Sequence, residues 1–130
     1  MNLLLDTHIW LWSHLSPERL SKRVTRALED SANQLWLSPV SLWEVIMLAA
    51  RGKIELQPDP PGWIRQALAT APTHEAPLSH DIALVTNDTG LRHRDPADRM
   101  LVATALVLDL TLVTGDQRIA KHAKARLLRN

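Results

Sequence analysis

Residues 95–116 read DPADRMLVATALVLDLTLVTGD, a stretch that predicts a helix, a strand and a turn in succession. Asp95-Pro96 is a typical helix start, because Asp caps the first turn and proline suits the first helical position. The apolar run that follows predicts a helix to about Asp109. Leu110 to Val113 then reads as a short buried strand, and Gly115-Asp116 turns the chain into a last helical segment. A helix that leads directly into a buried strand is typical of α/β folds.

The same alternation begins at the N-terminus. Leu3-Leu4-Leu5 and Leu35-Trp36-Leu37 are short apolar strands, and a weaker strand is expected near Glu75 to Leu78. The expected helices are Thr7 to Leu15, Ser16-Pro17 to Leu28, Ser38-Pro39 to Arg51, Gly62 to Ala71, His80 to Thr86 and a last one with Ile119, Ala120, Ala123 and Leu127 on one side. We therefore expect an α/β fold: one domain over residues 1–130, with a mostly parallel central sheet and helices on both faces.

Composition excludes several classes of protein. The 130 residues include no cysteine, which excludes disulfides, thiolate zinc sites, iron–sulfur clusters and a cysteine nucleophile. A hydrophobic fraction of 45% and a charged fraction of 22% are ordinary for a globular chain, and a net charge of +1 gives no sign of a nucleic-acid partner by itself. No targeting segment is visible, and the longest near-apolar run, Met100 to Leu108, is too short to span a bilayer. A cytoplasmic location is expected.

Four acids follow the predicted strands. Asp6 comes directly after the first strand, Glu44 lies early in the helix after the second, Asp98 lies in the first turn of its helix, and Asp116 follows the last strand. Carboxyl ends of parallel strands share one edge of a sheet, so these side chains should gather there. Two such charges about 4 Å apart repel by about 4 kcal/mol at an effective dielectric of about 20, so either one or more of the acids stays protonated or a cation sits between them. Oxygen-only ligands suit Mg²⁺ or Mn²⁺, and such an ion can activate water.

Each acid also has an ordinary structural interpretation. Asp98 and Asp116 stand where carboxylates stabilise helix starts, and Ser41 and Glu44 have the spacing of a capping box. Asp6 is harder to explain in this way, because an acid that closes an apolar strand has little structural use. The joint pattern favours a site.

Four blocks of this sequence resemble the PIN-domain ribonucleases, and most closely the VapC toxins of bacterial type II toxin–antitoxin systems. The blocks occur in the family's order and cover most of the chain to about Ile119, and Asp-Pro-x-Asp-Arg is the most specific part. They are Leu3 to Trp12, Ser38 to Glu44 with Gly52-Lys53-Ile54, His93 to Ala105, and Leu112-Val113-Thr114-Gly115-Asp116.

The resemblance implies a PIN-like three-layer sandwich and a Mg²⁺-dependent endoribonuclease, with Mn²⁺ as a possible substitute. Asp6 and Asp98 would be the main metal ligands, while Glu44 and Asp116 would hold a second ion or orient the attacking water. Thr114 would bond a ligand carboxylate, and Asp95 would cap its helix and brace the site.

The resemblance also implies partners: an RNA substrate such as transfer or ribosomal RNA, a cognate antitoxin whose tail covers the pocket, and a second copy in a homodimer. Trp10, Trp12 and Trp43 are candidate groove or dimer residues. Because Trp10 and Trp12 are two apart on a helix, one of them should be core. Core packing is also expected for Trp43, in an apolar stripe with Ile46, Met47 and Ala50.

The chain departs from the family at two places. Ala97 stands where the family's third block has a bulky aromatic residue. The C-terminus ends in a basic run instead of a strand, with cations that either hold RNA phosphates or belong to a frayed helix end: Arg118, Lys121, Lys124, Arg126 and Arg129. Around the third block, Arg92, His93, Arg94 and Arg99 would steer RNA or offset the acidic charge.

Three other functions stay open. A receiver domain or a haloacid-dehalogenase-like phosphatase would have a similar α/β fold. The phosphatase pattern needs an acid two residues after Asp6, where this chain has His8, and the receiver needs a lysine after its last strand, where this chain has Gly115-Asp116. A PIN-like fold that only binds RNA or protein would not need all four acids. A housekeeping RNA-processing PIN nuclease would keep the same site.

Overall fold

Five parallel strands form the centre of the computed structural model, which describes residues 1–91 and 95–130. The strands lie in the order β3-β2-β1-β4-β5. Their bounds are β1 Asn2–Leu5, β2 Gln34–Leu37, β3 His74–Glu75, β4 Thr111–Thr114 and β5 Leu127–Arg129. The expected α/β class with a parallel sheet is confirmed.

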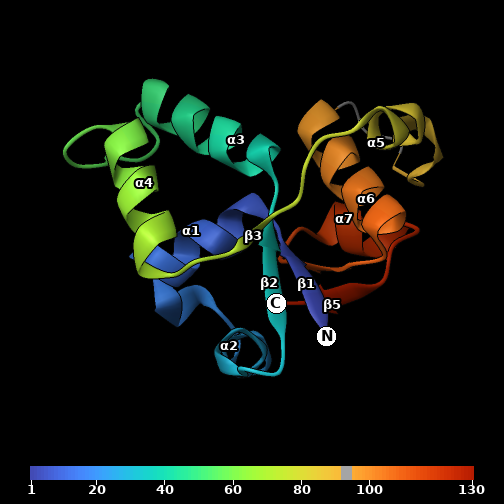
Figure 1. The fold of residues 1–130 in the computed structure, drawn as a ribbon, viewed down its shortest axis with the longest axis horizontal. Coiled ribbons are helices and arrows are strands. Elements are labelled where there is room, and N and C mark those ends of the chain that lie inside the picture. Colours follow the sequence, from blue (N-terminus) through green and yellow to red (C-terminus); the bar gives the residue numbers. More distant parts are fainter. Residues whose placement is uncertain (92–94) are drawn as a thin grey trace.

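Helices cover both faces of the sheet and make three layers (Figure 1). One face carries α1 Thr7–Leu15, α2 Lys22–Glu29, α3 Pro39–Ala50 and α4 Pro60–Thr70, and the other carries α5 His80–Leu84, α6 Pro96–Leu108 and α7 Gln117–His122. Short 3₁₀ turns, η1 Pro17–Arg19 and η2 Thr86–Asp88, follow α1 and α5. Within the described residues, no helix has the length and apolar character needed to cross a membrane.

The alternation of side chains along each strand divides the core. In β1, Leu3 and Leu5 pack with α1 to α4, whereas Leu4 packs with α6 and α7. All three are almost fully buried. Burying a leucine side chain contributes about 1.5–3 kcal/mol, so this short strand anchors both layers.

Two helix starts differ from the expectation. The segment from Ser16 to Leu28 is not one helix: η1 ends at Arg19, and Ser21 begins α2 by accepting a hydrogen bond from the Val24 N–H at 3.2 Å. Helix α4 begins at Pro60 instead of Gly62. Asp59 caps it through the Gly62 N–H at 2.7 Å, and prolines fit the first helical positions, so Pro60 and Pro61 belong to the helix.

The C-terminus and the third strand also correct the expectation. Helix α7 ends at His122, and the basic segment that follows forms β5, which pairs in parallel with β4 and buries Leu128. The expected helix through Leu127, frayed or intact, is therefore wrong. Strand β3 covers only His74–Glu75, and directly after it the Ala76 N–H donates to the Leu37 carbonyl at the end of β2, at 2.9 Å.

The tryptophans divide between core and surface. Trp10 is 1% exposed and lies in the core, as expected for one of the helix-α1 pair. Trp43 is 54% exposed and Ile46 is 40% exposed, so their expected core role is wrong. Helix α3 instead turns Leu42, Val45 and Leu48 toward the sheet, which leaves Trp43 on the outer side.

Candidate active site

The candidate site lies where the strand order reverses. After β1, the chain builds β2 and β3 on one side, and later β4 and β5 on the other, so β1 and β4 flank the switch point. In open α/β sheets, ligands bind beyond the carboxyl ends of strands at this point. Asp6 follows β1 directly, and its N–H donates to the Val113 carbonyl at 3.0 Å, which extends the pairing with β4.

Asp6 is a buried carboxylate held by two donors. It is 7% exposed, and Oδ1 accepts from the Thr7 N–H at 2.7 Å, which caps α1. Oδ2 accepts from the Thr114 hydroxyl at 2.7 Å, which is a bond to an acid of the kind that the family resemblance implied for Thr114. Burial raises the pKa of Asp6, while these two bonds and His8 act in the opposite direction. Burial therefore disfavours the charged form of Asp6, and the two hydrogen-bond donors offset only part of this effect.

Glu44 enters the site from α3. Its Oε1 accepts from the Thr7 hydroxyl at 2.5 Å, and the Ser41 hydroxyl lies 3.0 Å from the same Thr7 oxygen. Burial raises the pKa of Glu44 to about 7; the carboxylates of Asp6, Asp95 and Asp98 add to this rise, and the Thr7 bond opposes it.

Thr7 and Ser41 were not among the predicted site residues. The available signal was a hydroxyl residue placed immediately after Asp6, where α1 begins. Ser41 is not part of a capping box, because Ser38 caps α3 by accepting from the Val40 N–H at 3.1 Å.

Two predicted acids come from the start of α6. Asp95 caps this helix by accepting from the Ala97 N–H at 3.0 Å, as expected. Asp98 is 7% exposed and lines the same pocket as Asp6. The basic residues Arg92, His93 and Arg94, expected either to steer RNA or to offset the acidic charge, lie outside the described residues.

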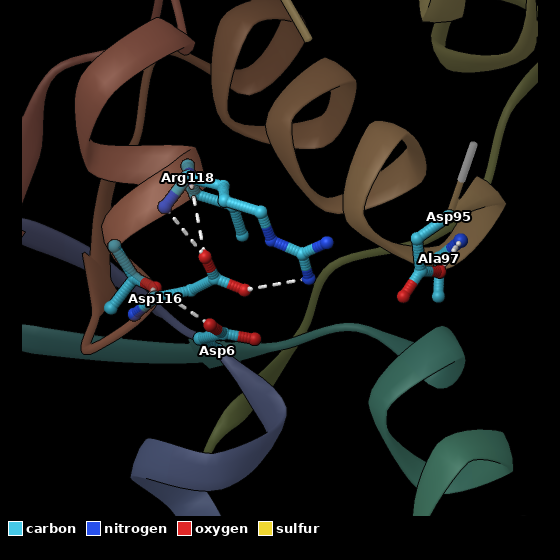
Figure 2. A network of polar contacts seen from close by, with 7 residues as sticks. Asp6, Asp95, Ala97, Asp116 and Arg118 are labelled. Atoms are coloured by element: carbon cyan, nitrogen blue, oxygen red, sulfur yellow. Dashed lines mark hydrogen bonds and ion pairs between the residues drawn. The ribbon is translucent and has the colours of Figure 1, made fainter. Parts of the chain in front are cut away.

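Asp116 and Arg118 form the β4–α7 side of the site. Asp116 caps α7, because Oδ1 accepts from the backbone N–H groups of Arg118 at 2.8 Å and Ile119 at 3.3 Å. The Arg118 guanidinium lies 3.6 Å from Asp116 Oδ2. Figure 2 shows Asp6 beside Asp116, with Arg118 extending from α7 toward the side where Asp95 lies. From the sequence, Arg118 was predicted only as one cation of the basic C-terminal run, and its contact with Asp116 was not predicted.

All four predicted acids reach one hollow. The cavity measures about 350 Å³. Its lining comes from α1, α3, α6 and α7 and from the residues that cap α1, α6 and α7: Asp6, His8, Trp12, Glu44, Asp95, Asp98, Asp116 and Arg118, together with Gly115. Five of these lining residues carry carboxylates.

The donor set suits a hard cation. Every acid offers carboxylate oxygens, the ligands that Mg²⁺ prefers. A bound cation would stabilise the charged forms of Asp6 and Glu44, whose pKa values are raised in its absence. Among residues 1–91 and 95–130, no three acidic or histidine side chains stand close enough to hold one ion together. The carboxylates would have to turn inward around an ion.

Most of the chain matches a known protein family. A family model described as PIN domain matches residues 3–125. The chain belongs to the PIN-domain family. Ribonuclease VapC22 of Mycobacterium tuberculosis is 32% identical over 127 residues, which cover 95% of this chain and 94% of that protein. This PIN domain therefore belongs with the VapC proteins, and the resemblance drawn from the sequence blocks is confirmed.

Solved structures share the fold of this PIN domain. The crystal structure of VapBC2 from Rickettsia felis, bound to a DNA fragment from their promoter, superposes with a TM-score of 0.72 at 15% identity and covers 99% of this chain and 98% of that one. FitAcB from Neisseria gonorrhoeae gives a TM-score of 0.62 at 21% identity, with 98% and 96% covered. The expected three-layer PIN architecture is thereby established.

Proposed function

We propose that residues 1–130 form a single PIN domain that acts as a Mg²⁺-dependent endoribonuclease toxin of a type II toxin–antitoxin system. One observation carries the proposal: four carboxylates far apart in sequence, Asp6, Glu44, Asp98 and Asp116, line one hollow at the switch point of the sheet. Its similarity to Ribonuclease VapC22 supports RNA as the substrate.

In this proposal, Asp6 and Asp98 are the main ligands of Mg²⁺, with Glu44 and Asp116 holding a second ion or orienting water. Bound Mg²⁺ would polarise the phosphodiester and lower the pKa of a coordinated water, and Mn²⁺ would substitute. The negative charge of the hollow, offset beside Asp116 by Arg118, favours such a cation.

The chain's own residues prepare the carboxylates. Thr114 holds one Asp6 oxygen through its hydroxyl, and the same hydroxyl oxygen accepts from the Asp116 N–H at 3.0 Å, so one side chain links both acids. Thr7 orients Glu44 in the same manner. A carboxylate whose pKa is about 7 can accept a proton from water at neutral pH, which suits Glu44 Oε2 to the role of general base.

We also propose a cognate antitoxin, a homodimer and a transfer or ribosomal RNA target. The antitoxin is supported by the similar folds in VapBC2 from Rickettsia felis and in DNA-bound VapBC from Salmonella typhimurium. A cationic antitoxin side chain among the acids would compete with the metal. Such RNA targets would place the activity in the cytoplasm.

The test is an RNA cleavage assay on protein freed of antitoxin, with Mg²⁺, Mn²⁺ or EDTA, on total transfer and ribosomal RNA. We expect metal-dependent cutting that Asp98→Asn abolishes, because asparagine fills the same space without the charge. Asp109→Asn, on the exposed carboxylate paired with Arg126 at 2.7 Å, is the matched control and should cut normally. An active Asp98→Asn protein would refute the metal-site assignment, and silence of folded protein on both RNAs would favour a binding-only PIN fold.

A further inference from the structure

A second hollow adjoins the carboxylate pocket. It measures about 250 Å³ and lies between α3 and the start of α6. Its α3 wall includes Trp43, Met47 and Arg51, and its α6 wall is Asp95 to Ala97. His8, Glu44 and Asp95 border both hollows, so the two are direct neighbours.

Trp43 is placed for contact with something outside the fold. Its side chain is 54% exposed although the core of α3 is well packed without it. Positions 43, 47 and 51 are four residues apart, so Trp43, Met47 and Arg51 form one ridge along the helix. An indole, a thioether and a guanidinium thus stand in a row beside Glu44.

Cations stand on the opposite side of the carboxylate pocket as well. A third hollow, of about 480 Å³, shares Gly115 and Asp116 with that pocket and includes Lys121 and Arg129 in its lining. The Arg129 guanidinium is held by donation to the Ala120 carbonyl at 3.0 Å. The second and third hollows share no lining residue, so the carboxylate pocket lies between them. This row of three hollows, called the groove below, has acids in the middle and cations toward both ends.

This order of groups matches a single-stranded polynucleotide. Phosphates pair with Arg and Lys, and unpaired bases stack on aromatic side chains, whereas the bases of a duplex are already stacked on each other. A protein partner suits the α3 end less well, because the cores of protein interfaces are depleted of charge. Here the charged residues Glu44 and Arg51 line the same hollow as the exposed Trp43 and the partly buried Met47.

We propose that single-stranded RNA lies along this groove, with one base stacked on Trp43 against Met47 and a neighbouring phosphate paired with Arg51. The inference rests on the proposed function, since it assigns the way in which the substrate of that site is held. Trp43 is then a specificity-determining residue for unpaired RNA next to the carboxylates.

The test measures RNA binding without turnover. In the Asp98→Asn background with Mg²⁺, fluorescence anisotropy reports the affinity for a labelled single-stranded oligoribonucleotide and for the same sequence as a duplex. Trp43→Ala should weaken single-strand binding by about 5- to 150-fold, the range for loss of one base–aromatic stack. Trp43→Phe should keep most of the affinity. Arg51→Gln should weaken binding and lower the slope of log affinity against log salt by about one.

Leu84→Ala is the matched control, because Leu84 is an apolar side chain on α5 that is 77% exposed and borders none of the three hollows. Equal affinities for Trp43→Ala and Leu84→Ala would overturn the inference, as would tighter binding of the duplex or no binding by the parent. A Trp43→Ala protein with altered mass in light scattering but unaltered RNA affinity would assign the ridge to a protein interface instead.

Failure of this inference is separable from failure of the proposed function. Binding in the Asp98→Asn background needs no cleavage, and the cleavage assay needs no contribution from Trp43. Cutting by the unmodified chain with no effect of Trp43→Ala on binding would reject only the stacking site. Trp43-dependent binding without any cutting would reject only the nuclease.

Discussion

Thr114→Val should destabilise the protein through loss of a buried hydrogen bond. The Thr114 hydroxyl is almost fully buried, donates to Asp6 Oδ2 at 2.7 Å and accepts from the Asp116 N–H at 3.0 Å. Valine has nearly the same shape, so the main loss is of these two bonds and not of packing.

The magnitude follows from the groups involved. A hydrogen bond to a charged group contributes about 1.5–3 kcal/mol, and a neutral backbone bond about 1 kcal/mol. Because Asp6 is only 7% exposed, water cannot easily replace the lost donor. Asp116 is partly exposed, and water can replace its lost acceptor. We therefore expect a loss of about 2–3 kcal/mol in the free energy of unfolding.

Urea unfolding followed by circular dichroism measures this loss. Thr104→Val is the matched control, because Thr104 is also buried but its hydroxyl only donates to the Met100 carbonyl of its own helix, at 2.7 Å. That variant should change stability by less than about 1 kcal/mol. In an Asp6→Asn background, the cost of Thr114→Val should fall to about 1 kcal/mol, since the acceptor is then neutral. A loss no larger than that of Thr104→Val would refute the assigned role of Thr114.

Metal, pH and backbone geometry give further predictions. Mg²⁺ at ten times its Kd should stabilise the fold by about 1.4 kcal/mol in thermal unfolding, and Asp98→Asn should remove this gain; an unchanged gain would count against the site. In EDTA, stability should fall as the pH rises from 4.5 toward 7, because Glu44 binds its proton more tightly in the folded state. Solvent screening at this partly exposed group limits the fall in stability to about 1 kcal/mol. The urea midpoint of Glu44→Gln should not show this fall, and equal pH profiles for Glu44→Gln and the unmodified chain would refute the role of Glu44. Gly90→Ala should cost more than about 2 kcal/mol, because φ is +85° and a Cβ would stand 2.3 Å from the His122 carbonyl oxygen. Gly52→Ala, at φ +70° in open space, should cost about 1 kcal/mol, and equal urea midpoints for the two variants would contradict the clash.

Features that depend on neighbouring residues could be predicted from the sequence. The apolar triplet before Asp6 is a strand because its side chains are buried on both faces, and Asp95 caps α6 because the cap needs only the next few N–H groups. The four acids were expected at one edge because parallel strands place their carboxyl ends together, and all four do border one hollow.

Other features were decided by contacts between distant segments. Residues 127–129 have no alternating pattern strong enough to mark a strand, and they become β5 because β4 offers an open edge and Leu128 finds a buried place beside it. The outward position of Trp43 depends on which face of α3 packs best against the sheet. The link from Thr7 to Glu44 joins residues 37 positions apart and exists only once α1 and α3 are packed together. The sequence alone thus determined the order of elements and the residue types at their ends, because these follow from local burial and capping. Tertiary packing decided which side chains meet, because hydrogen bonds and exposure depend on the full three-dimensional arrangement.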